Sequence, residues 1–171
     1  MDFSPLSWKA LHYATAFARK FDAEILMLHT VMVLAPGPEF QVASSLGNAS
    51  LHEDAVKTMA EWRKVITLQA SVKTRVLDGV PEHEIVRVAQ ENHIDLIIIG
   101  THGGSGFLNH FLGGTTKRVV RAARCPVLVV REHEHEFLAD AVKSNSHFRR
   151  SRSSKRGNMT TTTKKLQKIE L

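Results

Sequence analysis

Glycines follow an apolar run of the chain in an arrangement that could bind phosphate. The run Ile94–Ile99 leads directly into Gly100-Thr101-His102-Gly103, and after nine further residues Gly113-Gly114-Thr115-Thr116 opens a predicted helix. Such a run is typical of a strand buried on both faces, and glycine lets a backbone approach a ligand closely because it has no Cβ. A helix start adds unpaired N–H groups and the positive end of a dipole. The sequence therefore predicts a phosphate-binding loop at the carboxyl end of a parallel strand.

The spacing of these glycines excludes the two commonest nucleotide-binding loops. A dinucleotide fingerprint counted from Gly104 and Gly106 requires a third glycine where this chain has Asn109. A P-loop requires a lysine after its last glycine, and Gly114 is followed by Thr115. The pattern that remains is Gly100-x2-Gly103-x9-Gly113.

Further motifs occur in order on both sides of the loop. They are Asp2-Phe3-Ser4-Pro5 at the front, Leu28-His29 at the end of a predicted strand, Gly79-Val80-Pro81 before a predicted helix, and Pro126–Val130 after the loop. Together with the glycine pattern they resemble the universal stress protein family, in its UspA-like, ATP-binding branch. The resemblance runs from Asp2 to about Arg131. It implies one nucleotide-binding domain over residues 1–131 that acts as a dimer in the cellular stress response.

The resemblance implies a site for ATP or AMP, with or without Mg²⁺, in which the glycine loop binds the ribose and phosphates. Adenine would lie between Asp2, whose counterpart contacts the nucleoside, and Thr30, which stands where the family usually has valine. Asp2 has an alternative role, because it could instead cap the helix that begins near Ser4. The predicted cofactor-binding residues are Asp2, Thr30, Ile99, Gly100, Thr101, His102, Gly103, Gly104, Gly113, Gly114, Thr115 and Thr116.

The sequence predicts no catalytic residue and no metal-binding residue. No nucleophile with a visible base can be assembled from it, and no pair of carboxylates stands beside the glycine loop. We therefore expect a nucleotide-binding protein and not an enzyme. Slow ATP hydrolysis or self-phosphorylation, which some relatives show, stays open.

One departure from the family pattern concerns the phosphate site. Nucleotide-binding members carry Ser or Thr directly after the third glycine, whereas this chain has Gly114 there and hydroxyls displaced to Thr115 and Thr116. A hydrogen bond from a hydroxyl to a charged phosphate contributes about 1.5–3 kcal/mol. Its loss weakens the site unless Thr115 reaches the phosphate. The alternative function is therefore a dimeric interaction module of the same family that binds no nucleotide.

A second departure concerns the family's first strand. That strand ends in the aspartate matched by Asp2 and lies at the centre of the sheet, between the strands matching Glu24–Val31 and Ile94–Ile99. The residues before Asp2 provide no such strand, so the first strand is apparently missing. Two rows of unpaired ladder groups would result, which are costly when buried. We hypothesise a truncated reading frame; otherwise another chain donates a strand, or the fold is marginal.

The remaining segments alternate between helices and strands. Ser4 and Pro5 mark a helix start, and apolar residues then recur at helical spacing as far as Phe21. Residues 39–50 are expected to form a flexible loop, with the next helix beginning at Leu51. This alternation predicts an α/β fold with an open, doubly wound parallel sheet and helices on both faces. By resemblance it is Rossmann-like, of the adenine nucleotide alpha hydrolase type.

The positive charge is concentrated at the carboxyl-terminal end of the chain. The formal net charge is +6, and residues 140–171 hold nine basic and two acidic residues, so the remainder is close to neutral. We expect residues 132–171 to be a basic, disordered tail, because they are poor in apolar side chains. Contact between residues 149–156 and a polyanion is the alternative to a merely solvated extension. The domain itself shows no basic face for nucleic acid.

The final predicted strand, Val127–Val130, is an apolar edge that invites pairing. By resemblance it pairs with the same strand of a second copy, which gives a homodimer. Cys125 is the only cysteine, so an internal disulfide is excluded and a reducing compartment is indicated. No run of about 20 apolar residues occurs, so we expect no membrane partner and a cytoplasmic protein.

Overall fold

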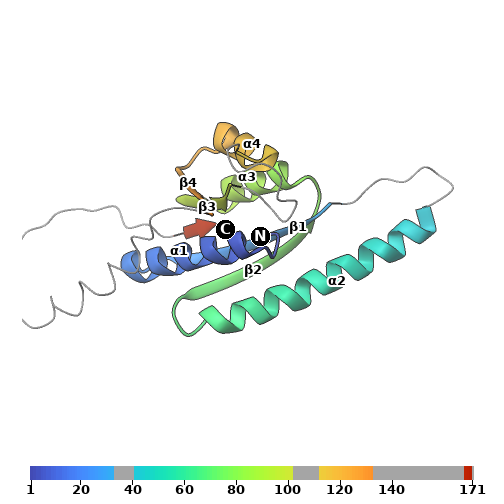
Figure 1. Ribbon diagram of the computed structural model, residues 1–171, viewed down its shortest axis with the longest axis horizontal. Helices are drawn as coiled ribbons and strands as arrows, with labels where there is room; N and C mark the ends of the chain where they lie inside the picture. Colours follow the sequence, from blue (N-terminus) through green and yellow to red (C-terminus); the bar gives the residue numbers. More distant parts are fainter. Residues whose placement is uncertain (33–40, 102–111, 133–167, 171) are drawn as a thin grey trace, which may run out of the picture.

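The computed structural model describes residues 1–32, 41–101, 112–132 and 168–170. Within these ranges, five strands form one parallel sheet in the order β2-β1-β5-β3-β4 (Figure 1). The elements in chain order are α1 (Pro5–Phe21), β1 (Glu24–Val31), α2 (Gln41–Ile66), β2 (Ser71–Asp78), α3 (Pro81–Glu91), β3 (Leu96–Gly100), α4 (Gly114–Ala122), β4 (Val127–Val130) and β5 (Lys168–Glu170).

Helices cover both faces of this sheet. α1 and α2 lie on one side and α3 and α4 on the other (Figure 1). Successive residues of β1 alternate between the two layers, because strand side chains point to opposite faces. Ile25 and Met27 belong to the core beneath α1 and α2, whereas Leu26 and Leu28 belong to the core beneath α3 and α4. This double burial explains the continuous apolar runs, and the predicted doubly wound α/β fold is confirmed.

α1 begins at the residues that the sequence indicated. The Ser7 N–H donates to Ser4 Oγ at 3.1 Å, and Pro5 occupies the first turn, where a backbone N–H has no intrahelical partner in any case. The helix ends at Asp22, which adopts the left-handed conformation with φ of 56°. Its N–H donates back to Ala18 O and closes the last turn.

α2 begins at Gln41 and not at Leu51, so the prediction of a flexible loop over residues 39–50 is wrong from Gln41 onward. Gly47 and the serines around it disfavour a helix by no more than about 1 kcal/mol each relative to alanine. No proline follows Pro38 in this stretch, so no backbone N–H is missing. The helix therefore extends through residues that resemble a loop in composition.

The place expected to be empty at the centre of the sheet is filled by β5. Ile169 pairs with Ile25 of β1 on one side and with Leu96 of β3 on the other, and its side chain has no exposed surface. The prediction of a disordered tail is therefore wrong for Lys168–Glu170. The backbone groups of β1 and β3 and the hydrophobic core between the helices order this segment. Residues 133–167 and 171 lie outside the described residues, and the domain boundary at 131 stays a prediction.

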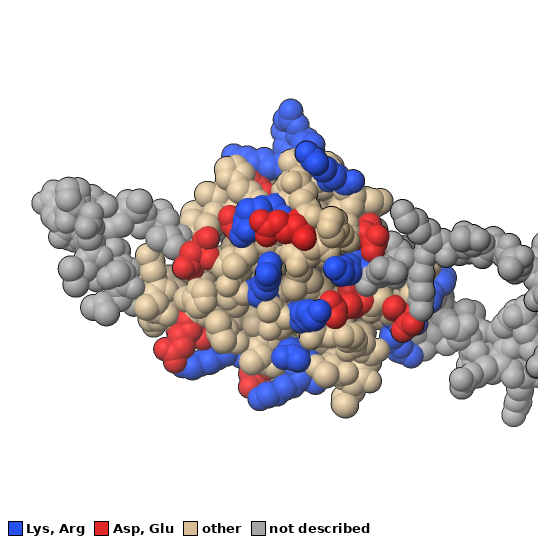
Figure 2. Space-filling model, turned by 180° about the vertical axis from the view of Figure 1, so that it is seen from behind, with Lys and Arg blue, Asp and Glu red and all other residues tan. Residues whose placement is uncertain are grey.

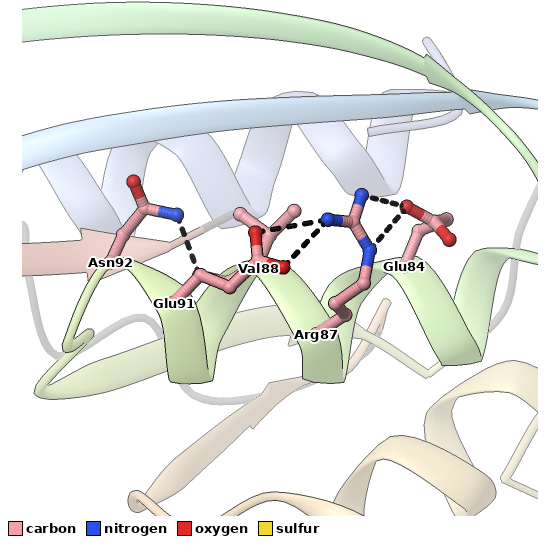
Figure 3. A network of polar contacts seen from close by, with 5 residues as sticks. All are labelled: Glu84, Arg87, Val88, Glu91 and Asn92. Atoms are coloured by element: carbon pink, nitrogen blue, oxygen red, sulfur yellow. Dashed lines mark hydrogen bonds and ion pairs between the residues drawn. The ribbon is translucent and has the colours of Figure 1, made fainter.

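The exposed side of α3 carries a polar network (Figure 3). Arg87 donates from Nε to Glu84 Oε2 at 3.1 Å, and from one Nη to both Glu91 carboxylate oxygens at 2.8 and 2.9 Å. Hydrogen bonds to Glu84 and then Glu91 raise the pKa of Arg87. Asn92 Nδ2 donates to Val88 O at 2.8 Å and closes the carboxyl-terminal turn. These contacts link successive turns of the helix that carries Glu82, a residue of the candidate site.

Candidate functional site

The two glycine segments that flank the predicted loop meet at the carboxyl edge of the sheet. β3 ends at Gly100, and the Thr101 N–H donates to Val130 O of β4 at 2.9 Å. From the other side, the Gly113 N–H donates to Thr101 O at 2.8 Å, and Thr116 Oγ1 donates to Gly100 O at 2.7 Å. These hydrogen bonds hold the start of α4 beside the end of β3, as a phosphate-binding loop requires.

α4 presents an amino-terminal end without a side-chain cap at this edge. Its N-cap is Gly113, and the first intrahelical bond runs from the Lys117 N–H to Gly113 O at 2.9 Å. The N–H groups of Gly114, Thr115 and Thr116 have no hydrogen-bond partner among the residues that the structure describes. Three such donors at the positive end of a helix dipole favour an anion.

The hydroxyls of Thr115 and Thr116 both face protein acceptors. Thr116 is buried and donates to Gly100 O, whereas Thr115 Oγ1 lies 3.5 Å from Glu82 Oε2, at the outer limit of a hydrogen bond. Both hydroxyls therefore already face an acceptor among the described residues. A Cβ added at Gly114 would meet no atom of the described residues within 4 Å, so this position has room for a side chain.

Glu82 is a residue of this site that the sequence did not indicate. It lies in the first turn of α3 with only 7% of its surface exposed, and its carboxylate forms an ion pair with Arg118 of α4. Burial raises the pKa of the Glu82 carboxyl, but the hydrogen bond to its own backbone N–H and the Arg118 guanidinium together outweigh burial and lower it. The pair joins the start of α3 to α4. In sequence, an acidic residue in a first helical turn suggests only a dipole interaction.

Asp2 lies at the start of α1 with its carboxylate already engaged. Its Oδ1 accepts from the Ser4 N–H at 3.1 Å, from Ser4 Oγ at 2.7 Å and from Ser7 Oγ. The Asp2 N–H donates in return to Ser7 Oγ at 3.1 Å. These bonds hold Ser4 and Ser7 in place, but the residue that caps α1 is Ser4, so the alternative role of Asp2 as the helix cap is wrong. The contact between Asp2 and a nucleoside stays a prediction.

Thr30 lies near the carboxyl end of β1, beside an aromatic group that the sequence did not predict. His29 stacks on Phe3 with ring centroids 4.5 Å apart, and Phe3 in turn meets the edge of Trp62 at 5.6 Å. Phe3 adopts a positive φ of 59°, which is unusual for a bulky residue. Burial lowers the pKa of His29, whose Nδ1 lies 2.6 Å from Met1 O. Phe3 and Trp62 pack against the core beneath α1 and α2.

Other predicted site residues have different outcomes. Ile99, Gly100 and Thr101 lie at the end of β3 as expected, whereas His102, Gly103 and Gly104 lie outside the described residues. Two hollows of about 460 and 550 Å³ open toward the opposite edge of the sheet, near the amino ends of its strands. They are lined by residues such as Glu24, Arg63 and Lys73, or Arg19 and Asp22. Neither hollow includes a predicted cofactor-binding residue.

Three further observations concern the charges, the metal-ligand residues and the helices of the described ranges. Lys and Arg are interspersed with Asp and Glu over the described part of the face seen in Figure 2, in agreement with the near-neutral balance of the domain. Among the described residues, no three or more His, Cys, Asp and Glu side chains gather as metal ligands. No helix in the described ranges has the length and apolar character needed to cross a membrane.

Comparison with known proteins places this arrangement in a family. The sequence model described as the universal stress protein family matches residues 1–131. Universal stress protein MJ0531 from Methanocaldococcus jannaschii is 35% identical over 144 residues, covering 79% of this chain and 81% of that protein. The structure of universal stress protein UspA from Lactobacillus plantarum is similar with a TM-score of 0.71 and 27% identity, covering 77% of this chain and 93% of that one.

A universal stress protein solved in complex with cAMP is also similar, with a TM-score of 0.56 and 23% identity, covering 77% of this chain and 91% of that one. At this identity the likeness concerns the fold. The family match spans the whole sheet except β5, including the glycine segments at its carboxyl edge. From these matches and this topology, the chain belongs to the universal stress protein family.

Proposed function

We propose that this protein binds an adenine nucleotide, ATP or AMP, at the carboxyl edge of its sheet and acts in the cellular stress response. The observation that supports this most is the start of α4, where three backbone N–H groups have no partner among the described residues. Thr116 holds these donors beside Gly100, and such a group is suited to phosphate. The neighbour solved with cAMP is an example of this fold with an adenine nucleotide.

In the proposed complex, the phosphates lie over Gly100, Gly113 and Gly114, whereas the predicted contact with Gly103 falls outside the described residues. The adenine lies between the ends of the chain segments that carry Asp2 and Thr30. Mg²⁺, when it accompanies ATP, is held by the phosphates themselves, because the described residues offer no cluster of three metal ligands.

The proposal further holds that the protein is a cytoplasmic homodimer and not an enzyme. β4 is the last strand of the sheet, so one of its edges has no partner strand within the described residues. Pairing of this edge with the same edge of a second copy would satisfy its backbone groups. Nucleotide occupancy, rather than turnover, would then be the signal that the dimer carries.

The test is thermal unfolding of the full chain with and without millimolar Mg-ATP. Ligand at 100 times its dissociation constant adds about 2.7 kcal/mol of stability, which raises Tm by several degrees for a domain of this size. Gly114→Ser adds the hydroxyl that relatives use, and the open space at this position accommodates it. Gly114→Ala is the matched control, since it adds the Cβ without the hydroxyl. We expect at least several-fold tighter binding for Gly114→Ser than for Gly114→Ala.

The second candidate is an interaction module of the same family that binds no nucleotide. This function is favoured because both threonine hydroxyls at the start of α4 already face protein acceptors. Thr116 donates to Gly100 O, and Thr115 lies beside Glu82. Cooperative unfolding that Mg-ATP leaves unchanged in the natural chain and in both Gly114 variants would support this second function and contradict the first.

A further inference from the structure

The space between β1 and β3 is a slot for one extended strand. Its walls are the backbones of Glu24–Leu26 in β1 and Leu96–Ile97 in β3, and β5 pairs with both in the parallel direction. If the slot were empty, the N–H and C=O groups of both walls would be unpaired at the centre of the sheet. The fold therefore needs an occupant here, whatever its source.

Side chains as well as backbone groups hold the strand that occupies this slot. The Lys168 N–H donates to Asp95 Oδ2 at 2.9 Å, and the Asp95 N–H donates to Lys168 O at 2.9 Å. Lys168 Nζ donates to Asn92 O at 2.8 Å, at the carboxyl end of α3, where the helix dipole favours a cation. Ile169 then enters the core with no exposed surface. These contacts select a lysine followed by a branched apolar residue.

We infer that this slot is a peptide-binding site, and that Lys168–Glu170 is a resident strand that a separate peptide of the same kind can replace. β5 is the shortest strand of the sheet, with three residues, and it reaches the slot through the long segment 131–167. The occupant is thus an extended strand that completes the sheet by backbone pairing, with one buried apolar side chain for specificity. This inference does not depend on nucleotide binding.

The attachment of β5 to the chain determines how the inference has to be tested. A tethered strand has an effective concentration on the order of millimolar, so a free peptide competes poorly with an intact β5. Replacement of Ile169 by aspartate in the full chain places a charge in the core and removes the resident strand from the slot. The probe is a synthetic peptide of residues 164–171, and the control peptide carries aspartate in place of Ile169.

We expect the Ile169→Asp chain to lose its cooperative thermal transition, and the natural peptide to restore it with saturation at one peptide per chain. The control peptide has no effect at the same concentration. Ile169→Val keeps a branched apolar side chain, and we expect it to melt cooperatively with a Tm lower by only a few degrees. Loss of the cooperative transition in Ile169→Asp is then attributable to the removal of β5 from the slot and not to any change at this position. Fluorescence anisotropy of labelled peptide and native mass spectrometry give the affinity and the stoichiometry.

Three results would overturn the inference. A cooperative Ile169→Asp chain with a Tm near that of the natural chain would mean that β5 does not occupy the slot. An unfolded variant that millimolar peptide fails to restore would mean that the slot does not bind a separate strand. A natural chain that is a dimer, and that Ile169→Asp converts to folded monomers, would assign β5 to an interface between copies.

Discussion

Asp95, in the turn before β3, and Lys168, the first residue of β5, exchange two hydrogen bonds: the Lys168 N–H donates to the Asp95 carboxylate, and the Asp95 N–H donates to Lys168 O, each at 2.9 Å. This pair fixes where β5 enters the sheet. The chain thereby joins two segments that are far apart in sequence at the centre of the sheet.

Asp95→Ala removes the side-chain half of this pair. We expect a loss of about 1–3 kcal/mol in the free energy of unfolding, because the Lys168 N–H is left without its acceptor in a partly buried position. Urea denaturation at neutral pH measures the loss. Asp95→Asn, which retains an acceptor oxygen, is the control and should lose less. Equal stability of Asp95→Ala and the natural chain would show that β5 enters the sheet without this contact.

The Glu82–Arg118 ion pair predicts a pH-dependent contribution to stability. The pKa of Glu82 is lower in the folded chain than its ordinary value of 4.5, so the folded state favours the ionised carboxylate. Its contribution is therefore fully present above pH 4.5 and is lost as pH falls through the lower, folded pKa. Glu82→Gln should be less stable than the natural chain at pH 7, and the difference should shrink in acid.

Urea denaturation at several pH values between neutral and acid measures this difference. Glu61→Gln is the control, because it removes an exposed pair with Lys64 on α2 and should change the pH dependence little. A constant difference between Glu82→Gln and the natural chain at all pH values would contradict the ionised state of Glu82.

The two threonines at the start of α4 predict unequal effects of the same substitution. Thr116→Val should lower the free energy of unfolding by about 1 kcal/mol, because a 2.7 Å hydrogen bond from a buried hydroxyl to Gly100 O is lost. Thr115→Val should have a smaller effect, since its hydroxyl lies 3.5 Å from Glu82. Denaturant titrations of both variants test the order. The opposite order would mean that Thr115, and not Thr116, anchors α4.

Two glycines predict opposite responses to alanine. Gly79 has φ of +149°, and a Cβ there would lie 2.9 Å from Glu84 Cγ, so Gly79→Ala should cost about 1–3 kcal/mol in the free energy of unfolding. Gly114→Ala should be close to neutral, because its Cβ would meet nothing within 4 Å. Thermal unfolding of the two variants compares them directly. A stable Gly79→Ala chain would show that the turn before α3 relaxes without loss.

Much of the fold could be predicted because its signals are local. Ser4 and Pro5 indicate the start of α1 through one capping bond and one missing N–H, and both act within a single turn. The apolar runs of β1 and β3 indicate strands buried on both faces, and the glycine spacing indicates the edge of the sheet at which we propose the phosphate site. The start of α2 at Gln41 could not be predicted in this way, because composition disfavours that helix only weakly.

Local patterns in the sequence are thus enough to predict the alternation of helices and strands, the family and the edge of the sheet that carries the glycines. Three features became visible only in the folded chain: Thr116 anchors α4 on Gly100, Glu82 meets Arg118, and Lys168–Glu170 completes the sheet. All three features have the same cause. A three-residue strand, a buried carboxylate or a helix-start hydroxyl has no strong preference of its own, and its state follows from partners that folding brings from distant parts of the chain.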